Sequence, residues 1–123
     1  MKRALLAVGG FPVMVEMAET QEEQRKGLMG RSRLPGGHGM LFSYTESGDR
    51  AFWMHNTTIP LDIAFADDGA ITSIGSLEPL SERLVHGYGD MALEMPAGWF
   101  ADHGVDAGHR IRLVMSFGEV GNG

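Results

Sequence analysis

Eighteen of the 123 residues in this chain are glycines. This share is roughly twice that of an ordinary protein, and it indicates many tight turns and therefore short strands. A chain of this length corresponds to one domain with a core of its own. We therefore expect a single domain, residues 1–123, built from short elements.

Apolar and polar residues alternate in several short segments, which is typical of strands with one buried face. Strands are expected at residues 13–17, 39–42, 51–54, 61–65, 71–74, 91–95 and 110–117. Turns or loops are expected at residues 31–38, 45–49, 67–69 and 77–88, with a frayed tail at residues 118–123.

Two short helices are predicted among these strands. Thr20 and Glu23 form the pattern of a capping box, which predicts a helix from Gln21 to about Met29 that Gly30 can close. Residues 97–103 have room for one or two helical turns. The predicted fold class is mainly β (α+β), a small β-sandwich or barrel with one or two short helices.

Charge and cysteine content exclude several classes of function. Sixteen acidic and ten basic residues give a net charge of −6, so the chain lacks the basic footprint that binds nucleic acid. It also lacks a cluster of lysines and arginines for an anionic membrane. Because cysteine is absent, disulfides and thiolate metal sites are excluded, and the redox compartment is left open.

The N-terminus begins like a secretion signal, with Lys2 and Arg3 before the apolar residues 4–8. Five apolar residues are too few, because a signal sequence needs roughly 7–15 of them. We therefore expect no membrane span. The chain as written predicts a cytoplasmic protein, or an exported, periplasmic one if a leader has been removed.

Two carboxylates, Asp62 and Glu94, each lie in a predicted strand on the side opposite three large apolar residues. If the two strands are near neighbours, both side chains would line one shallow pocket. Such a pair can act as general acid and base, or can hold a cation. The structural alternative is that one carboxylate caps a turn and the other pairs with Arg31 or with solvent, since ion-pair networks give the same pattern.

The segment from Trp53 to Thr57 contains the densest group of unusual residues in the chain. Trp53 and Met54 offer apolar walls, and Asn56 and Thr57 can donate and accept hydrogen bonds. That mixture is typical of a ligand pocket. The alternative is that Trp53 and Met54 belong to the core, while Asn56 and Thr57 satisfy loop backbone groups before Pro60.

The five histidines, at positions 38, 55, 86, 103 and 109, do not have the spacing of a metal-binding motif. Each lies in a different expected loop or turn. We predict neither a metal site nor a cofactor. If a metal does bind, His55, next to Asn56, is the first residue to test.

Several of these segments occur together in one known family. They are Gly27-Leu28-Met29 with Arg31, Gly39-Met40-Leu41-Phe42, Phe52-Trp53-Met54 with Asn56-Thr57, Pro60-Leu61-Asp62 with Ile63 and Phe65, and Leu93-Glu94 with Gly98. In this order they resemble the bacterial and archaeal domain-of-unknown-function family 192, over about residues 13–114. The resemblance is specific, because several blocks match in sequence.

The resemblance implies a small β-rich domain, jelly-roll-like or barrel-like, with one or two helices and often an N-terminal export signal. It implies no established activity. The family's characteristic polar positions fall on Thr20, Arg31, Asn56, Thr57, Asp62 and Glu94. The chain departs from the family pattern at His38, where an acid is common, and at His55, where a lysine is common. The second departure argues against a mechanism that needs a fixed positive charge at position 55.

Three functions are consistent with these residues. The first is a module that binds a small molecule or peptide segment, with Arg31 favouring a carboxylate or phosphate on the ligand. Its expected pocket is lined by Arg31, Met40, Trp53, Met54, Asn56, Thr57, Asp62 and Glu94. The second is a hydrolase-type enzyme with Asp62 and Glu94 as acid and base, and the third is a structural or assembly protein with exposed methionines. Binding is favoured over catalysis, because no nucleophile–base pair is visible. The sequence does not determine the oligomeric state.

Overall fold

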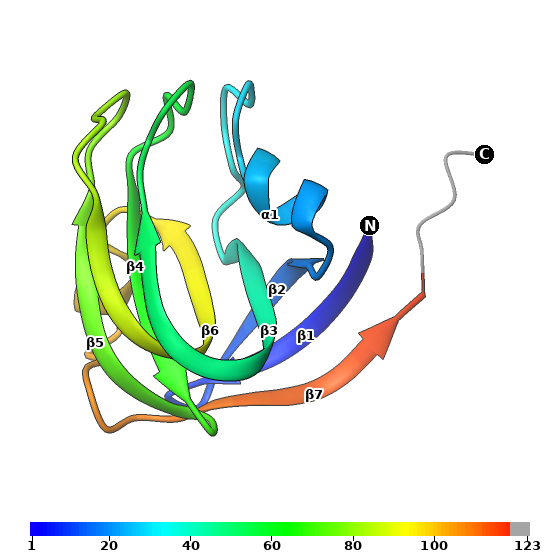
Figure 1. Ribbon diagram of the computed structural model, residues 1–123. Coiled ribbons are helices and arrows are strands. Elements are labelled where there is room, and N and C mark those ends of the chain that lie inside the picture. The colour runs from blue at the N-terminus through cyan, green and yellow to red at the C-terminus, as the bar shows by residue number, and fades with distance from the viewer. Residues whose placement is uncertain (119–123) are drawn as a thin grey trace.

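The computed structural model of the protein describes residues 1–118, which form seven strands and two short helices (Figure 1). The strands are β1 (Lys2–Val8), β2 (Phe11–Ala18), β3 (His38–Phe52), β4 (Leu61–Asp67), β5 (Ala70–Leu77), β6 (Val85–Pro96) and β7 (Ile111–Phe117). The helices are α1 (Gln21–Lys26) and α2 (Trp99–Asp102). The predicted class, mainly β with short helices, is confirmed.

All seven strands belong to one sheet, in the order β5-β4-β6-β3-β2-β1-β7. β2 and β3 are parallel, and the other neighbouring pairs of described strands are antiparallel. The sheet is strongly curved, and its edge strands β5 and β7 form no ladder with each other (Figure 1). Among the described residues they meet where they begin, at an isolated antiparallel bridge that joins Ala70 to Arg110, the residue before β7. Within the predicted β-rich class, the arrangement is therefore one open sheet rather than a closed barrel.

β3 is a single long strand where the sequence predicted two strands and a turn at residues 45–49. It bends where its register with β6 shifts, between Ser43 and Gly48. The rings of Phe42 and Phe52 lie with their centroids 4.8 Å apart. Ten residues of straight strand would separate them by about 33 Å. The predicted turn is thus a sharp bend inside a continuous strand, which curls around one face of the sheet.

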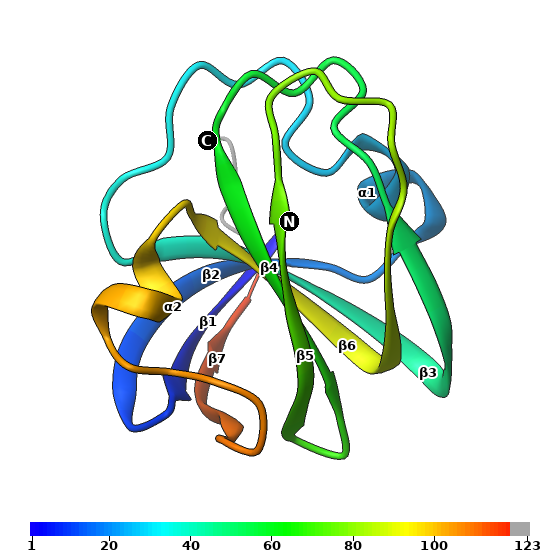
Figure 2. The same ribbon diagram turned by 90° about the vertical axis from the view of Figure 1, so that its left-hand side faces the viewer.

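Apolar side chains are buried on both faces of the sheet. One core contains Leu6, Leu93 and Met95 and is covered by α2. The other contains Ile63 and Phe65 and is covered by the turn after α1. The two helices accordingly lie on opposite sides of the view in Figure 2. Because both faces of the sheet are buried, a side chain that points away from one core points toward the other.

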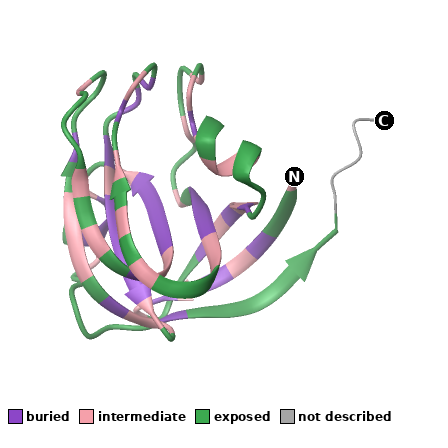
Figure 3. Ribbon diagram, in the orientation of Figure 1, coloured by how far each residue is buried: buried purple, intermediate pink, exposed green. Residues whose placement is uncertain are grey.

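The apolar run near the N-terminus forms most of β1, where Ala4, Leu6 and Val8 are buried. These residues are part of the core in this structure. β7 pairs with β1 and is exposed beyond Ile111 (Figure 3). In the described part of the chain, neither helix has the length or apolar character needed to cross a membrane.

Several element boundaries differ from the prediction. α1 ends at Lys26, and its C-cap is Gly27 rather than Gly30, because Gly27 has a φ of 48°, a conformation that glycine adopts easily. β6 begins at Val85, inside the predicted loop, because its first residues pair with the second half of β3. Of the predicted frayed tail, residues 119–123 lie outside the described residues.

Candidate ligand-binding pocket

A pocket with a volume of about 550 Å³ opens on the face of the sheet that carries the Ile63 core. Small-molecule sites in proteins occupy roughly 300–1,000 Å³, so the pocket has room for such a ligand. Its walls come from the end of α1 and the turn after it, from β3, and from residues 53–57. Glu94 of β6 lies at its floor.

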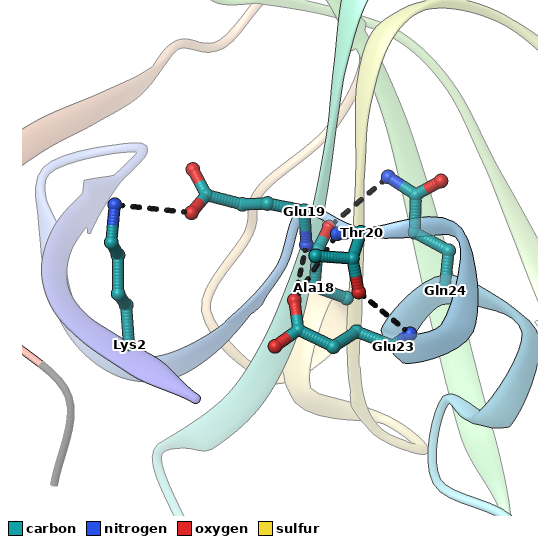
Figure 4. Close-up of polar contacts among 6 residues, drawn as sticks. All are labelled: Lys2, Ala18, Glu19, Thr20, Glu23 and Gln24. Carbon is teal, nitrogen blue, oxygen red and sulfur yellow. Dashed lines mark hydrogen bonds and ion pairs between the residues drawn. The ribbon is translucent and has the colours of Figure 1, made fainter.

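The capping box predicted at α1 is present and fixes the helix beside the pocket (Figure 4). The Thr20 hydroxyl accepts a hydrogen bond from the backbone N–H of Glu23 at 3.1 Å, and the Glu23 carboxylate accepts one from the backbone N–H of Thr20 at 3.1 Å. The Gln24 side chain then donates to the carbonyls of Ala18 (3.2 Å) and Ser43 (2.9 Å). These bonds tie the helix to β2 and β3, so its last turn is held at the pocket mouth.

The loop of residues 53–57 is anchored by backbone bonds on two sides. The Met54 N–H donates to the carbonyl of Ser81 at 2.9 Å, and the Asn56 carbonyl accepts from the N–H of Gly30 at 3.1 Å. Asn56 has a φ of 54°, a left-handed conformation that asparagine tolerates better than most residues. The hydroxyl of Thr57 donates to the loop carbonyl of residue 55 at 3.1 Å. The Thr57 side chain thus satisfies a loop backbone group, as the alternative predicted, and Asn56 contributes its own carbonyl, while both residues line the pocket.

Trp53 and Met54 form two different parts of the wall. Met54 is buried in the core, whereas Trp53 is 44% exposed. The indole stacks on the ring of His55, with centroids 4.9 Å apart and planes 24° apart. His55 in turn lies with its Nδ1 2.6 Å from a carboxylate oxygen of Glu82. Trp53 therefore offers a large apolar surface at the pocket mouth that the core does not use.

Glu94 is the most unusual residue of the pocket. It is only 4% exposed, and burial raises the pKa of its carboxyl to about 8. Within residues 1–118, no hydrogen bond or ion pair reaches this carboxyl group, although no fully enclosed polar atom lacks a partner. The carboxyl oxygens are therefore open only to the pocket. Near neutral pH most of this group is protonated, because a charge there would lie in an apolar environment without compensation.

Tyr44 of β3 is a titratable residue that lines the pocket with Glu94. Burial raises the pKa of its phenol, the Arg50 guanidinium opposes this increase, and Glu94 adds to it. Arg50 lies over the Tyr44 ring at 3.8 Å from the centroid and donates from Nε to the Gly89 carbonyl at 3.0 Å. Arg50 is therefore bound elsewhere and leaves Glu94 without a cation.

Five of the eight residues predicted to line the pocket meet in it: Trp53, Met54, Asn56, Thr57 and Glu94. The other three lie elsewhere. Met40 is fully buried in the core directly beside Glu94, its partner across β3 and β6, and does not reach the pocket.

Arg31 lies outside the pocket and forms a two-point ion pair with Glu16. Its Nη2 donates to Oε1 of Glu16 at 2.8 Å, and Nη1 donates to Oε2. The hydrogen bond from Arg31 is the main cause that lowers the pKa of Glu16, and the same bond raises the pKa of Arg31. The proposed role of Arg31 in holding a ligand carboxylate or phosphate in this pocket is therefore wrong.

Asp62 and Glu94 lie on opposite faces of the sheet. Glu94 pairs across β4 with Ile63 and shares its face, whereas Asp62 is the preceding residue of β4 and points the other way. The Asp62 carboxylate accepts a hydrogen bond from the backbone N–H of Gly98 at 2.8 Å, at the start of α2. The prediction that both carboxylates line one pocket is wrong, and the structural alternative for Asp62, a turn cap, is the observed one.

The pocket also has lining residues that the sequence did not predict, among them Arg25, Lys26, Phe42, Tyr44 and Phe52. The two cations stand in the last turn of α1, and the aromatic residues stand on both arms of the bent β3. The capping box could have located Arg25 and Lys26 on the helix. The turn predicted at residues 45–49 marked the position of the bend, but it did not indicate that both arms of β3 pair with β6 and line one pocket.

The histidines do not gather at this pocket. Among the described residues, no group of three or more histidine, aspartate or glutamate side chains is placed to hold a metal ion. Of the two departures from the family pattern, His55 lines the pocket, and His38 is exposed at the start of β3.

The fold and the pocket together define a small α+β domain: one open, curved sheet with a half-open pocket and a buried carboxyl group at its floor. The sequence matches the family DUF192, described as "Uncharacterized ACR", over residues 4–113. The chain belongs to this family, as its motifs indicated.

Two crystal structures are similar to this chain. One is a candidate transcription regulator from Sinorhizobium meliloti 1021, with 33% identity and a TM-score of 0.82, covering 91% of this chain and 92% of that one. The other is a protein of unknown function from Novosphingobium aromaticivorans DSM 12444, with 32% identity and a TM-score of 0.83, covering 89% and 84%. No curated protein matches the chain.

Proposed function

We propose that this protein is a binding module that holds a small molecule or a short peptide segment in the pocket between α1, β3 and residues 53–57. The observation that carries this proposal is the Glu94 carboxyl, which is buried at the pocket floor without a partner. A buried polar group without a partner destabilises the fold by roughly 1–3 kcal/mol. A ligand that completes its hydrogen bonds would remove this cost.

The walls and the mouth limit the ligand further. Phe42, Phe52 and Trp53 present aromatic surface, which favours an apolar body. Arg25 and Lys26 at the end of α1 are the cations that line the pocket, and neither forms an ion pair among the described residues. They replace Arg31 as the groups that favour a carboxylate or phosphate on the outer end of the ligand.

The geometry does not support the hydrolase alternative, because Asp62 and Glu94 are on different faces of the sheet. The name of the Sinorhizobium meliloti protein points to transcription, but the net charge of −6 argues against general attraction of this chain to the phosphates of DNA. Binding of a small ligand is therefore the function that the pocket supports best.

The proposal is tested by screening a library of aromatic carboxylates against the uniformly labelled protein. The readout is the side-chain resonance of Trp53, with buried Trp99 on the other face as the internal reference. We expect hits to shift Trp53 and to lose roughly tenfold in affinity in Trp53→Ala.

The charges at the mouth are tested with the double variant Arg25→Ala/Lys26→Ala. Hits should bind roughly two- to fivefold more weakly to it for each exposed cation removed. Arg112→Ala, an exposed cation on β7, is the matched control and should leave affinity unchanged. If no compound perturbs Trp53, or if the β7 variant weakens binding as much as the double variant, the proposal is wrong.

A further inference from the structure

The chemistry of the pocket floor narrows the ligand class, provided that the pocket binds a ligand as proposed above. Glu94 lies on the same face as Ile63, its partner on β4, and Met40, its partner on β3, and both partners are fully buried apolar residues. No described residue supplies a donor or a cation to its carboxyl oxygens. The ligand must therefore supply the partner, and the partner must suit the form that this carboxyl takes.

A neutral carboxyl group has one O–H donor and one carbonyl acceptor side by side. An amide presents the complementary pair, an N–H donor and a carbonyl acceptor. A carboxyl held neutral in an apolar site can donate a hydrogen bond in this way. An ammonium group would instead require a charged carboxylate at this depth, where solvation of the charge is lost.

The charged groups that line the pocket with Glu94 also favour an amide over an ammonium group as the partner of Glu94. From α1 they are Arg25 and Lys26, which a cationic ligand would have to pass at the mouth. From β3 the facing group is Tyr44, whose phenol is uncharged near neutral pH, and burial raises its pKa further. The 53–57 loop contributes His55, which is paired with Glu82. None of these groups would attract an amine into the pocket.

We propose that Glu94, in its neutral form, recognises an amide-type group on an apolar ligand by donating one hydrogen bond and accepting another. The ligand class is thus a primary or secondary amide with an apolar body, uncharged where it meets Glu94, and it is either a free small molecule or part of a peptide segment. This inference goes beyond binding as such, because it assigns the recognition chemistry to one residue.

Three probes of nearly equal size separate the possible partners of Glu94: phenylacetamide, phenethylammonium and phenylacetate. Each is titrated at pH 7 into the protein while the Trp53 side-chain resonance is followed. We expect phenylacetamide to bind at least tenfold more tightly than phenethylammonium. N-acetyl-phenylalaninamide is then compared with the dipeptide acetyl-Ala-Phe-amide. Tighter binding of the dipeptide indicates a peptide segment as the ligand, and tighter binding of the single residue indicates a free small-molecule amide.

Two substitutions at the floor and one control assign the contact. Glu94→Met removes both hydrogen bonds and should weaken phenylacetamide at least tenfold. Glu94→Gln cannot ionise, so its affinity for phenylacetamide should not depend on pH between 6 and 9, whereas the unaltered protein should lose affinity above about pH 8, where Glu94 ionises. Asp62→Asn, on the opposite face, should leave affinity unchanged. Thermal melting confirms that each variant is folded.

The outcomes separate this inference from the proposed function. If phenethylammonium binds as tightly as phenylacetamide or more tightly, or if Glu94→Met binds the amide normally, the amide inference is overturned and the pocket is still a binding site. If none of the probes perturbs Trp53 at millimolar concentration, the inference and the proposed function both fail.

Discussion

Glu94 shows how a single residue can indicate a function, because the packing of the core does not require a glutamate at this position. A glutamate between Met40 and Ile63 gives the folded protein no contact that an apolar residue would not give. It keeps a polar group in a buried place, which lowers stability. Natural proteins accept such a cost mainly where a site requires it, so the residue is informative before any ligand is known.

The same residue predicts a pH dependence of stability. The folded protein keeps a proton on Glu94 up to about pH 8, whereas the unfolded chain releases it near the ordinary glutamate pKa of 4.5. The contribution of Glu94 to the free energy of unfolding should therefore be greatest below pH 4.5 and fall as pH rises from 4.5 to 8, by roughly 1 kcal/mol per pH unit. Urea denaturation at pH 5, 6, 7 and 8 measures this slope.

The control for this prediction is Glu94→Gln, which should remove the decrease because it has no proton to release. Glu16 and Glu23 should not produce a decrease of this kind, because hydrogen bonds lower the pKa values of both carboxyl groups, which has the opposite effect on the pH dependence of stability. Equal slopes in the unaltered protein and in Glu94→Gln would contradict the assignment of the raised pKa to this residue.

At the scale of elements, the bend of β3 and the tight pairing of β3 with β6 create the pocket. The bend brings Phe42 and Phe52 together on one wall, and the pairing places Glu94 between the arms. The pairing is close because Gly39 faces β6 without a side chain. A Cβ atom at Gly39 would lie 2.3 Å from the Glu94 carbonyl oxygen and 2.5 Å from the sulfur of Met95.

Gly39→Ala should therefore destabilise the protein strongly. The Met95 side chain can move, but the backbone oxygen cannot without breaking the pairing of β3 with β6. Overpacking of this kind costs roughly 1–3 kcal/mol, and a clash with backbone is at the upper end. Chemical denaturation at pH 6 measures the loss.

Gly36→Ala is the matched control, three residues away. A Cβ at Gly36 would meet no atom within 4 Å, so its unfolding free energy should change by less than about 0.5 kcal/mol. If Gly39→Ala proves as stable as Gly36→Ala, the close approach of β3 and β6 at this position is not present in solution.

At the scale of the whole molecule, the open sheet leaves one face for the pocket and the other for α2, and the exposed β7 forms one edge. Charge is the other global property. The chain carries a net charge of −6, and the two cations at the pocket mouth are too few to form a basic surface.

This charge predicts that the protein does not retain DNA. In an electrophoretic mobility assay at 50 mM salt, a labelled duplex of random sequence should migrate unchanged with micromolar protein, since non-specific affinity depends on neutralising phosphates. The low salt favours detection of weak binding. A salt-sensitive shift of the duplex would show a nucleic-acid function like the one suggested by the name of the Sinorhizobium meliloti protein.

The sequence predicted the local structure well where the signal was local. Alternation located the strands that became β2, β4 and β7, and Thr20 with Glu23 located the start of α1. The family was recognisable from its motifs. These features depend on neighbours along the chain, so a single sequence contains them.

The sequence could not tell which face of the sheet each carboxylate would occupy. Ile63 and Phe65 face one core, whereas Leu93 and Met95 face the other. Alternation separates the two sides of one strand, but it does not say which side of a neighbouring strand is the same face. Only the register between β4 and β6 decides this, and it places Asp62 and Glu94 apart.

Glu94, Trp53 and the loop of residues 53–57 were therefore within reach of sequence reasoning, because their residue types are unusual for a strand or a turn. The loss of Asp62 and Arg31 from the site, and the entry of Arg25, Lys26 and the aromatic residues of β3, were decided by tertiary structure. The physical reason is that the register between strands arises from packing two cores on one sheet, which no local pattern specifies. A local pattern marked the turn at residues 45–49, but only the pairing of both arms of β3 with β6 makes it a bend within one strand.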